Sequence, residues 1–317
     1  MAQKTKPRPA AKGRGKESSS NFRARRAVLQ LLLLVVIGGG AAFGLQRLKT
    51  YVERDLAFPA DPLIVVIKNR PAWMSDDVVE HIATTARPTG AHSAFDHQML
   101  VDCRTALEAD PWVARVNEVR RAYTNQPGDT LEIDCDFRVP TAWVRWGEFY
   151  WLVDRQAVKL PEQVAAGQMP GEMMGADGRV NVRIIDGVRQ PPPEAGQKWS
   201  GADLAAGLEM AAVLFDRPYT EKILKIDVAN FAGRQNPAAA QIVLGTQFGT
   251  SIYWGRPPSD PDAFIEIRPD RKLQTLADIE QKFGRVDMKQ PWIDIRFEGV
   301  RYPAPTGPAS ASLDNQR

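Results

Sequence analysis

The longest apolar run of the chain lies near its N-terminus and predicts a helix that crosses a membrane. Residues 27–45 carry no charge, and Gln30 is the only polar side chain among them. As an α-helix this run is about 28 Å long, which matches the roughly 30 Å of bilayer hydrocarbon. We therefore predict a transmembrane helix over residues 27–46. A cleaved signal peptide is the alternative, but it requires a shorter apolar core and a small-residue cleavage site, which residues 40–42 only weakly imitate.

Two glycines in this run have the spacing of a helix-packing motif. Gly40 and Gly44 form a GxxxG pair, and such a pair lets two membrane helices approach closely. Glycine is also frequent in membrane helices that have no such role. A packing face for a second helix and an ordinary membrane helix therefore both remain open.

Alternating and periodic apolar positions predict a small domain over residues 62–140, with the order strand, helix, helix, strand, strand. Leu63–Ile67 is a continuous apolar run of the kind found in short buried strands. Ser75 is a suitable N-cap for the first helix, and the second helix is expected over residues 96–109. Strands are expected over residues 112–121 and, with strict alternation of apolar and polar side chains, over residues 130–138.

A second domain is predicted over residues 141–302. Short apolar or alternating runs separated by Gly, Pro and Asp predict a mainly antiparallel sheet. Two helices are expected beside this sheet, one over residues 203–215 and one that includes Leu276, Ile279 and Phe283. The strands are expected at residues 142–146, 150–153, 180–185, 223–228, 241–244, 251–254 and 293–297. The fold class is therefore α+β, and residues 303–317 are expected to be disordered.

The charge pattern predicts how the chain is oriented in the membrane. One Glu and nine Lys or Arg precede the apolar run: Lys4, Lys6, Arg8, Lys12, Arg14, Lys16, Arg23, Arg25 and Arg26. Short basic flanks stay on the cytoplasmic side and can contact lipid headgroups. We therefore predict a cytoplasmic tail over residues 1–26, a linker over residues 47–61 and a folded body outside the cytoplasm.

The body itself is acidic. Residues 1–49 hold 11 Lys or Arg and one acid, which leaves 30 basic (41 − 11) and 37 acidic (38 − 1) residues beyond them. The positive charge of the whole chain therefore comes from the tail and its flank. This distribution gives no reason to expect nucleic-acid binding by the body.

The sequence contains no recognisable catalytic motif. The three histidines, His81, His92 and His97, form neither an HExxH motif nor a pair spaced for a zinc site on a helix. Asp134 and Asp136 share one face of a predicted strand, where alternating acids usually form the solvated side. We therefore predict a protein that is not an enzyme and that has no cofactor, no metal and no small-molecule substrate.

The two cysteines are predicted to enter the same core. Cys103 lies on the apolar stripe of its predicted helix, and Cys135 lies on the inward face of its predicted strand. A disulfide requires Cα atoms within about 7 Å of each other, and the folded body is predicted to lie in a compartment that can be oxidising. Buried free thiols and a disulfide are therefore both compatible with the sequence.

One stretch resembles a known family. The run PWVARVNEVRRAYTNQPGDTLEIDCDFRVPTAWVRWGEFYWLVDRQAVKLP, residues 111–161, resembles the junction between the POTRA domain and the β domain of the FtsQ/DivIB cell-division family. The similar features are a Pro-Trp-Val sequence, an Arg-x-Pro turn and a Trp-Leu-Val-Asp strand. The run WIDIRF, residues 292–297, resembles the closing strand of that family. The resemblance implies a POTRA-like domain over residues 62–140 and an FtsQ-like β domain over residues 141–302.

The resemblance also implies a function and a site. Members of this family are single-pass proteins of the bacterial inner membrane that bind FtsB and FtsL at the division septum and help recruit wall synthesis. Their partner contact lies on the last strand and the residues after it, here Ile293, Ile295, Phe297, Val300 and Tyr302. A core-facing strand explains the alternation of Ile293, Ile295 and Phe297 equally well. A POTRA-bearing protein of secretion or outer-membrane assembly is the main alternative, and a wall-modifying enzyme is another.

Overall fold

The computed structural model describes residues 18–55, 57–58, 63–90, 92–93, 96–123, 127–165, 167, 182–260 and 266–304. The predicted tail 1–26 lies partly, and the predicted disordered end 303–317 almost wholly, outside these residues. The chain divides into two compact units. One contains Met1–Asp61 and Ala91–Asp96, and the other contains Pro62–Gly90 and His97–Arg317.

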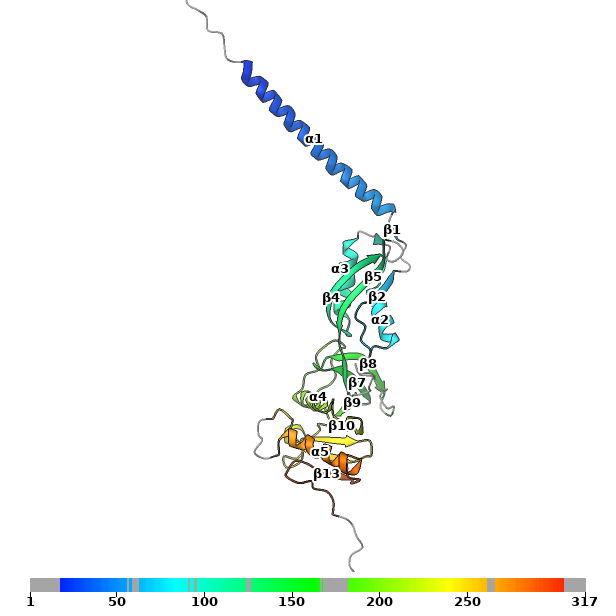
Figure 1. Cartoon of the computed structure of the whole chain (residues 1–317), viewed down its shortest axis with the longest axis vertical. Coiled ribbons are helices and arrows are strands. Elements are labelled where there is room, and N and C mark those ends of the chain that lie inside the picture. Colours follow the sequence, from blue (N-terminus) through cyan, green and yellow to red (C-terminus); the bar gives the residue numbers. More distant parts are fainter. Residues whose placement is uncertain are drawn as a thin grey trace, which may run out of the picture. The chain divides into compact units, whose positions relative to one another are not determined.

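The first unit consists mainly of one long helix. Helix α1 spans Ser18–Asp55, and Figure 1 shows it as one uninterrupted helix. Its segment Arg25–Tyr51 is the one helix among the described residues that is long and apolar enough to cross a membrane, and none of that window is buried in protein. The prediction of a single apolar helix is confirmed, although the helix extends beyond residue 46 because no Gly or Pro follows until Pro59. A two-stranded sheet pairs β1 (Ala57–Phe58) with β3 (His92–Ser93).

The second unit begins with a three-stranded sheet and two helices. In chain order these elements are β2 (Ile64–Ile67), α2 (Asp76–Ala86), α3 (His97–Ala109), β4 (Val113–Tyr123) and β5 (Pro127–Phe137). The structure thus contains the five predicted elements in the predicted order. β5 is the central strand, parallel to β2 and antiparallel to β4.

Local sequence signals explain these boundaries. The hydroxyl of Ser75 accepts a hydrogen bond from the backbone N–H of Val78, which makes Ser75 the N-cap of α2 as predicted. Along β5 the side chains of Leu131, Ile133 and Cys135 are buried, and they join one core with the apolar residues of α2 and α3. The alternation of this strand therefore predicted its buried face correctly.

An eight-stranded sheet forms the rest of the second unit. Its strand order is β13-β12-β11-β10-β9-β6-β7-β8. The strands are β6 (Pro140–Trp146), β7 (Phe149–Asp154), β8 (Lys159–Ala165), β9 (Arg183–Asp186), β10 (Ile223–Asp227), β11 (Ile242–Thr246), β12 (Ser251–Gly255) and β13 (Trp292–Asp294). Helices α4 (Ala202–Leu214) and α5 (Pro269–Phe283) contribute buried residues to the same core as this sheet. Two short 3-10 turns cover Thr220–Lys222 and Phe231–Gly233.

The sheet was predicted to be mainly antiparallel, and three of its seven strand pairs are parallel. β9 lies between β6 and β10 and is parallel to both, and β13 is parallel to β12. The four remaining pairs are antiparallel. Apolar patterns mark where strands occur, but they do not fix which strands become neighbours, so these parallel pairs were not predictable. The sheet is therefore mixed rather than uniformly antiparallel.

The two sheets of the second unit share a hydrophobic core. Trp143, Leu152 and Leu160, from β6, β7 and β8, join the core formed by α2, α3 and the three-stranded sheet. The opposite faces of β6 and β7 contribute Val144 and Val153 to the core around α4 and α5. The predicted domain boundary at residue 140 therefore crosses a continuous apolar core.

An ion pair fixes the chain where it passes from β5 to β6. The guanidinium of Arg138 lies 3.1 Å from the carboxylate of Asp154, whose side chain is almost completely buried. Asp154 also accepts hydrogen bonds from the backbone N–H groups of Gln156 at 2.9 Å and Val158 at 2.8 Å. The Arg-x-Pro turn and the Trp-Leu-Val-Asp strand, both noted in the sequence, thus meet through Arg138 and Asp154.

Candidate protein-binding surface

The last strand lies at one edge of the eight-stranded sheet, and two of the predicted partner-binding side chains on it are buried. β13 pairs only with β12 inside the sheet, in parallel register from Ser251↔Trp292 to Tyr253↔Asp294. Ile293 and Ile295 have exposed fractions of 0% and 1% and belong to the core around α4 and α5. Their side chains are therefore not accessible to a partner, and the alternative of a core-facing strand describes them correctly.

The chain folds back along the outer edge of β13. The backbone N–H of Asp294 donates to the carbonyl of Arg301 at 2.8 Å, and the N–H of Arg301 donates to the carbonyl of Asp294 at 3.0 Å. Gly299 makes this return possible because its φ of 77° is unfavourable for other residues. At Asp294 the edge of the sheet is thus paired with the protein's own chain, which limits strand addition there.

An ion pair stabilises the start of this return. Arg296 donates to both carboxylate oxygens of Asp294, with N–O distances from 2.8 to 3.2 Å, and to the carbonyl of Ala238 at 3.1 Å. Burial alone would raise the pKa of Asp294, but the hydrogen bonds from Arg296 outweigh it and hold the pKa below its ordinary value. The carboxylate therefore stays ionised, and the ion pair holds the return in place.

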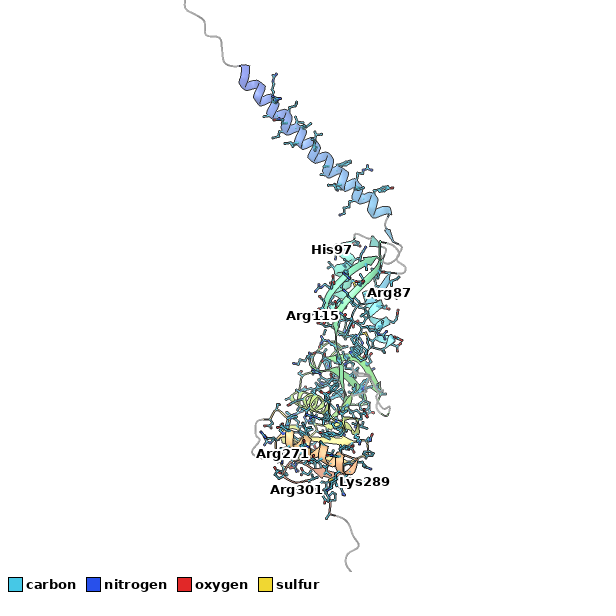
Figure 2. The ribbon with its side chains drawn as sticks, viewed as in Figure 1. Arg87, His97, Arg115, Arg271, Lys289 and Arg301 are labelled. Atoms are coloured by element: carbon cyan, nitrogen blue, oxygen red, sulfur yellow. The ribbon has the colours of Figure 1, made fainter. Side chains whose placement is uncertain are left out.

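The residues after the ion pair form an exposed aromatic and cationic surface. The ring of Phe297 is half-buried, with the guanidinium of Arg296 5.1 Å and that of Arg301 4.8 Å from its centroid. Tyr302 is 46% exposed, and Val300 is half-buried against the core. We call Phe297, Arg301 and Tyr302 the return surface. Figure 2 shows Arg301 near the end of the described chain.

The return surface corrects the predicted site in two ways. Of the five predicted residues, Phe297 and Tyr302 present side-chain surface to solvent and Val300 does so in part, whereas Ile293 and Ile295 do not. Arg301 was missed by the sequence reasoning, although an Arg near an aromatic residue in an exposed segment is a common feature of protein interfaces. The remaining site is small and combines two aromatic side chains, Phe297 and Tyr302, with the cation of Arg301.

The two glycines of the predicted membrane-packing motif lie on the exposed surface of α1. A Cβ atom built on Gly40 or on Gly44 would meet no atom within 4 Å. The backbone at both positions is therefore accessible to a second helix, and the role of the GxxxG pair remains a prediction.

Of the titratable groups considered for chemistry, His81, Asp134 and Asp136 make structural contacts. Nε2 of His81 lies 2.8 Å from the carboxylate of Asp110, which also accepts from the backbone N–H of Trp112 at 2.9 Å. Asp134 and Asp136 lie on the exposed face of β5, where the amide of Asn117 donates to both. Among the described residues, no group of three or more His, Cys, Asp or Glu side chains is arranged to hold a metal ion.

Both cysteines are free thiols in a shared core. Burial raises the pKa of Cys103 to about 12, and the neighbouring Cys135 adds to this rise. Burial likewise raises the pKa of Cys135 to about 11, with smaller contributions from Asp134 and Asp136. Only thiolates react rapidly as nucleophiles, so both side chains are expected to be inert in the folded protein.

This leads to a prediction about thiol labelling. At pH 8 the folded protein should not react with iodoacetamide, whereas the same protein unfolded in guanidinium chloride without reductant should gain two carbamidomethyl groups by mass spectrometry. The unfolded Cys103→Ala variant should gain only one carbamidomethyl group. Rapid labelling of the folded protein would contradict the burial of the thiols. Labelling of the unfolded protein only after reduction would show a disulfide.

No model of a known protein family matches this chain, and no curated protein matches it either. These comparisons therefore do not test the resemblance of residues 111–161 and 292–297 to the FtsQ/DivIB family.

Proposed function

We propose that this protein is a bitopic membrane scaffold whose body lies outside the cytoplasm and binds other membrane proteins of the cell-division machinery. The observation that carries the proposal is one apolar helix with a basic N-terminal flank, followed by a β-rich body that ends in an exposed return surface. The helix supplies the tether, and the tail supplies the orientation through the positive-inside rule. The return surface supplies aromatic and arginine side chains, which are enriched where proteins bind each other.

The division machinery is inferred from the resemblance to the FtsQ/DivIB family. In that interpretation the POTRA-like domain is formed by β2, α2, α3, β4 and β5, and the partners are single-pass proteins similar to FtsB and FtsL. The location is the inner membrane at the septum. The order of elements and the ion pair between Arg138 and Asp154, which joins the two motifs of the resemblance, support this assignment.

Site-specific crosslinking in cells tests the proposal. A photoreactive amino acid at Tyr302 should crosslink to a single-pass membrane protein, which mass spectrometry would identify. The same group at Arg115, whose side chain is 72% exposed on β4, is the matched control and should not give that product. Depletion of the protein should produce filamentous cells. Normal septation on depletion would contradict the division role, and a Tyr302 crosslink to an outer-membrane protein would favour the assembly alternative.

A further inference from the structure

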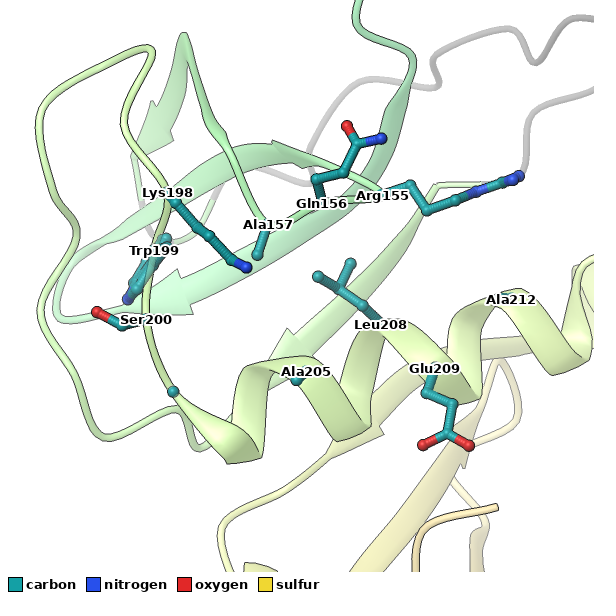
Figure 3. A pocket seen from close by; sticks show the side chains of 11 residues that line it. Arg155, Gln156, Ala157, Lys198, Trp199, Ser200, Ala205, Leu208, Glu209 and Ala212 are labelled. Carbon is teal, nitrogen blue, oxygen red and sulfur yellow. The ribbon is translucent and has the colours of Figure 1, made fainter. Parts of the chain in front are cut away.

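A hollow in the second unit lies on a different part of the body from the return surface. Its volume is about 570 Å³, and it is formed by the turn between β7 and β8, the residues that precede α4, and one side of α4. Ala157 and Leu208 are buried and form an apolar floor, and the exposed small residues Ala205 and Ala212 of α4 leave space above it. Figure 3 shows these side chains around the hollow.

Two cations line the hollow without a counter-charge. Arg155 and Lys198 are exposed, and neither forms an ion pair with any part of the chain that the structure describes. Figure 3 shows the ammonium group of Lys198 directed toward the space between Ala157 and Leu208, whereas Arg155 extends away from it. The one acid in the lining, Glu209, accepts a hydrogen bond from the hydroxyl of Ser259 at 2.8 Å and points away from Lys198.

The backbone holds Lys198 in this position. Val158 and Lys198 form an isolated antiparallel bridge, and the N–H of Trp199 donates to the carbonyl of Ala157 at 2.7 Å. The indole N–H of Trp199 donates to the carbonyl of Gln190 at 3.0 Å, so this almost fully buried ring anchors the segment that carries Lys198. The main chain that carries Lys198 and the apolar floor are therefore held on a fixed frame, which limits the entropic cost of binding to the ordering of side chains.

We propose that this hollow is a second protein-binding site, which takes an extended acidic segment of a partner protein. A small aliphatic side chain of that segment would lie on Ala157 and Leu208, and a neighbouring carboxylate would pair with Lys198. Arg155 points away from Lys198, so a second carboxylate further along the same segment would pair with Arg155. Two separated cations beside an apolar floor match a peptide better than a compact ligand that has one negative charge. The positive lining also contrasts with the net charge of −7 beyond residue 49 (30 basic and 37 acidic residues), so it provides local complementarity to an acidic partner.

A peptide-binding experiment on the full-length protein in detergent micelles tests this site. The probe is the fluorescein-labelled peptide Gly-Asp-Val-Ala-Asp-Gly, and the control probe has Asn in place of both Asp residues. Fluorescence anisotropy should show saturable binding of the acidic probe only, and the binding should weaken as sodium chloride is added. Absence of saturable binding of the acidic probe, or equal binding of the Asn probe, would overturn the proposal.

Variants assign the binding to the hollow. Lys198→Ala should weaken binding about tenfold, because a charge-assisted hydrogen bond is lost, and Ala205→Trp should abolish it by filling the space without a change of charge. Arg271→Ala, which removes an exposed cation of α5 that does not line the hollow, should leave binding unchanged.

Equal affinities for Lys198→Ala, Ala205→Trp and the unmodified protein would overturn the proposal. So would equally effective competition by free glutarate, because it would identify a site for small carboxylates. A Tyr302→Ala variant, which changes the return surface and no residue of the hollow, should still bind the peptide, so the two sites are tested separately.

Discussion

Replacing Lys272 by Met should lower the free energy of unfolding by about 3–5 kcal/mol, which corresponds to a fall in melting temperature of about 10 °C. Lys272 has a side-chain exposure of 3%, and its ammonium lies 2.5 Å from the carboxylate of Glu266 and 2.7 Å from the carbonyl of Trp254. Its nitrogen also lies 5.1 Å from the centroid of the Trp254 ring. Met has a similar shape but no charge, so the variant leaves the carboxylate of Glu266, only 10% exposed, without its partner. Thermal unfolding followed by circular dichroism measures the effect.

A double variant separates the unpaired charge from lost packing. Burial lowers the pKa of Lys272, and the contact with Glu266 opposes that change. Each of the two buried charges is therefore tolerated only while its partner is present. Lys272→Met combined with Glu266→Gln should recover most of the lost stability, because no buried charge remains. Arg271→Met on the exposed face of the same helix is the matched control and should change the melting temperature little. A Lys272→Met variant as stable as the unmodified protein would show that the contacts of Lys272 with Glu266 and Trp254 do not stabilise the packing of α5.

Replacing Asp154 by Ala should lower the free energy of unfolding by about 3 kcal/mol. The carboxylate accepts two backbone N–H groups in the turn before β8, and it neutralises Arg138, whose side chain is only 19% exposed. Ala removes all three interactions and leaves the buried N–H of Val158 without this acceptor. Chemical denaturation followed by tryptophan fluorescence measures the loss.

Two further variants assign that loss to the turn or to the ion pair. Asp154→Asn keeps an acceptor oxygen for the N–H groups of Gln156 and Val158 but removes the charge, so it should cost less than Asp154→Ala. Arg138→Met keeps the turn and leaves the carboxylate with its backbone donors, so it should also cost less. If Asp154→Asn is as damaging as Asp154→Ala, the ion pair with Arg138 dominates. An Asp154→Ala variant with the same free energy of unfolding as the unmodified protein would contradict a structural role for the junction.

Local patterns predicted most of the elements because their causes are local. The capping of α2 by Ser75, the buried face of β5 and the apolar helix near the N-terminus each follow from a few neighbouring residues. The extension of α1 to Asp55 was not predicted, because the prediction was based on the length of the apolar run rather than on helix propensity. Helix propensity continues past the last apolar residue as long as no Gly or Pro intervenes.

The elements that were missed depend on distant parts of the chain. β8 was not among the predicted strands. It contains Pro161, which is unusual inside a strand. The proline is tolerated because β8 is an edge strand and Pro161 is not among the residues that pair with β7. The parallel pairs of β9 and the burial of Ile293 and Ile295 likewise depend on which elements become neighbours, and the sequence pattern carries no such information.

The resemblance suggested a region for the candidate site but not which of its side chains are exposed. Partner binding there stays a prediction. The resemblance pointed to the last strand and the residues after it, and that region contains the half-buried ring of Phe297 and the exposed side chains of Arg301 and Tyr302. Alternation alone could not tell a core-facing strand from a partner-facing one. The return that pairs Arg301 with Asp294 determines where the side chains after the strand lie, and this return depends on the turn at Gly299.

Cysteine labelling in intact spheroplasts tests the central claim, that the helix tethers the body on the outer side of the membrane. The two native thiols are buried and should stay unlabelled. Arg271→Cys, at an exposed position of α5 outside the return surface, and Lys12→Cys each supply a single thiol for labelling. A membrane-impermeant maleimide should label Arg271→Cys in intact spheroplasts and Lys12→Cys only after permeabilisation, with both proteins remaining full-length in the membrane fraction. Labelling of Lys12→Cys without permeabilisation, or protection of Arg271→Cys until the membrane is opened, would contradict the account.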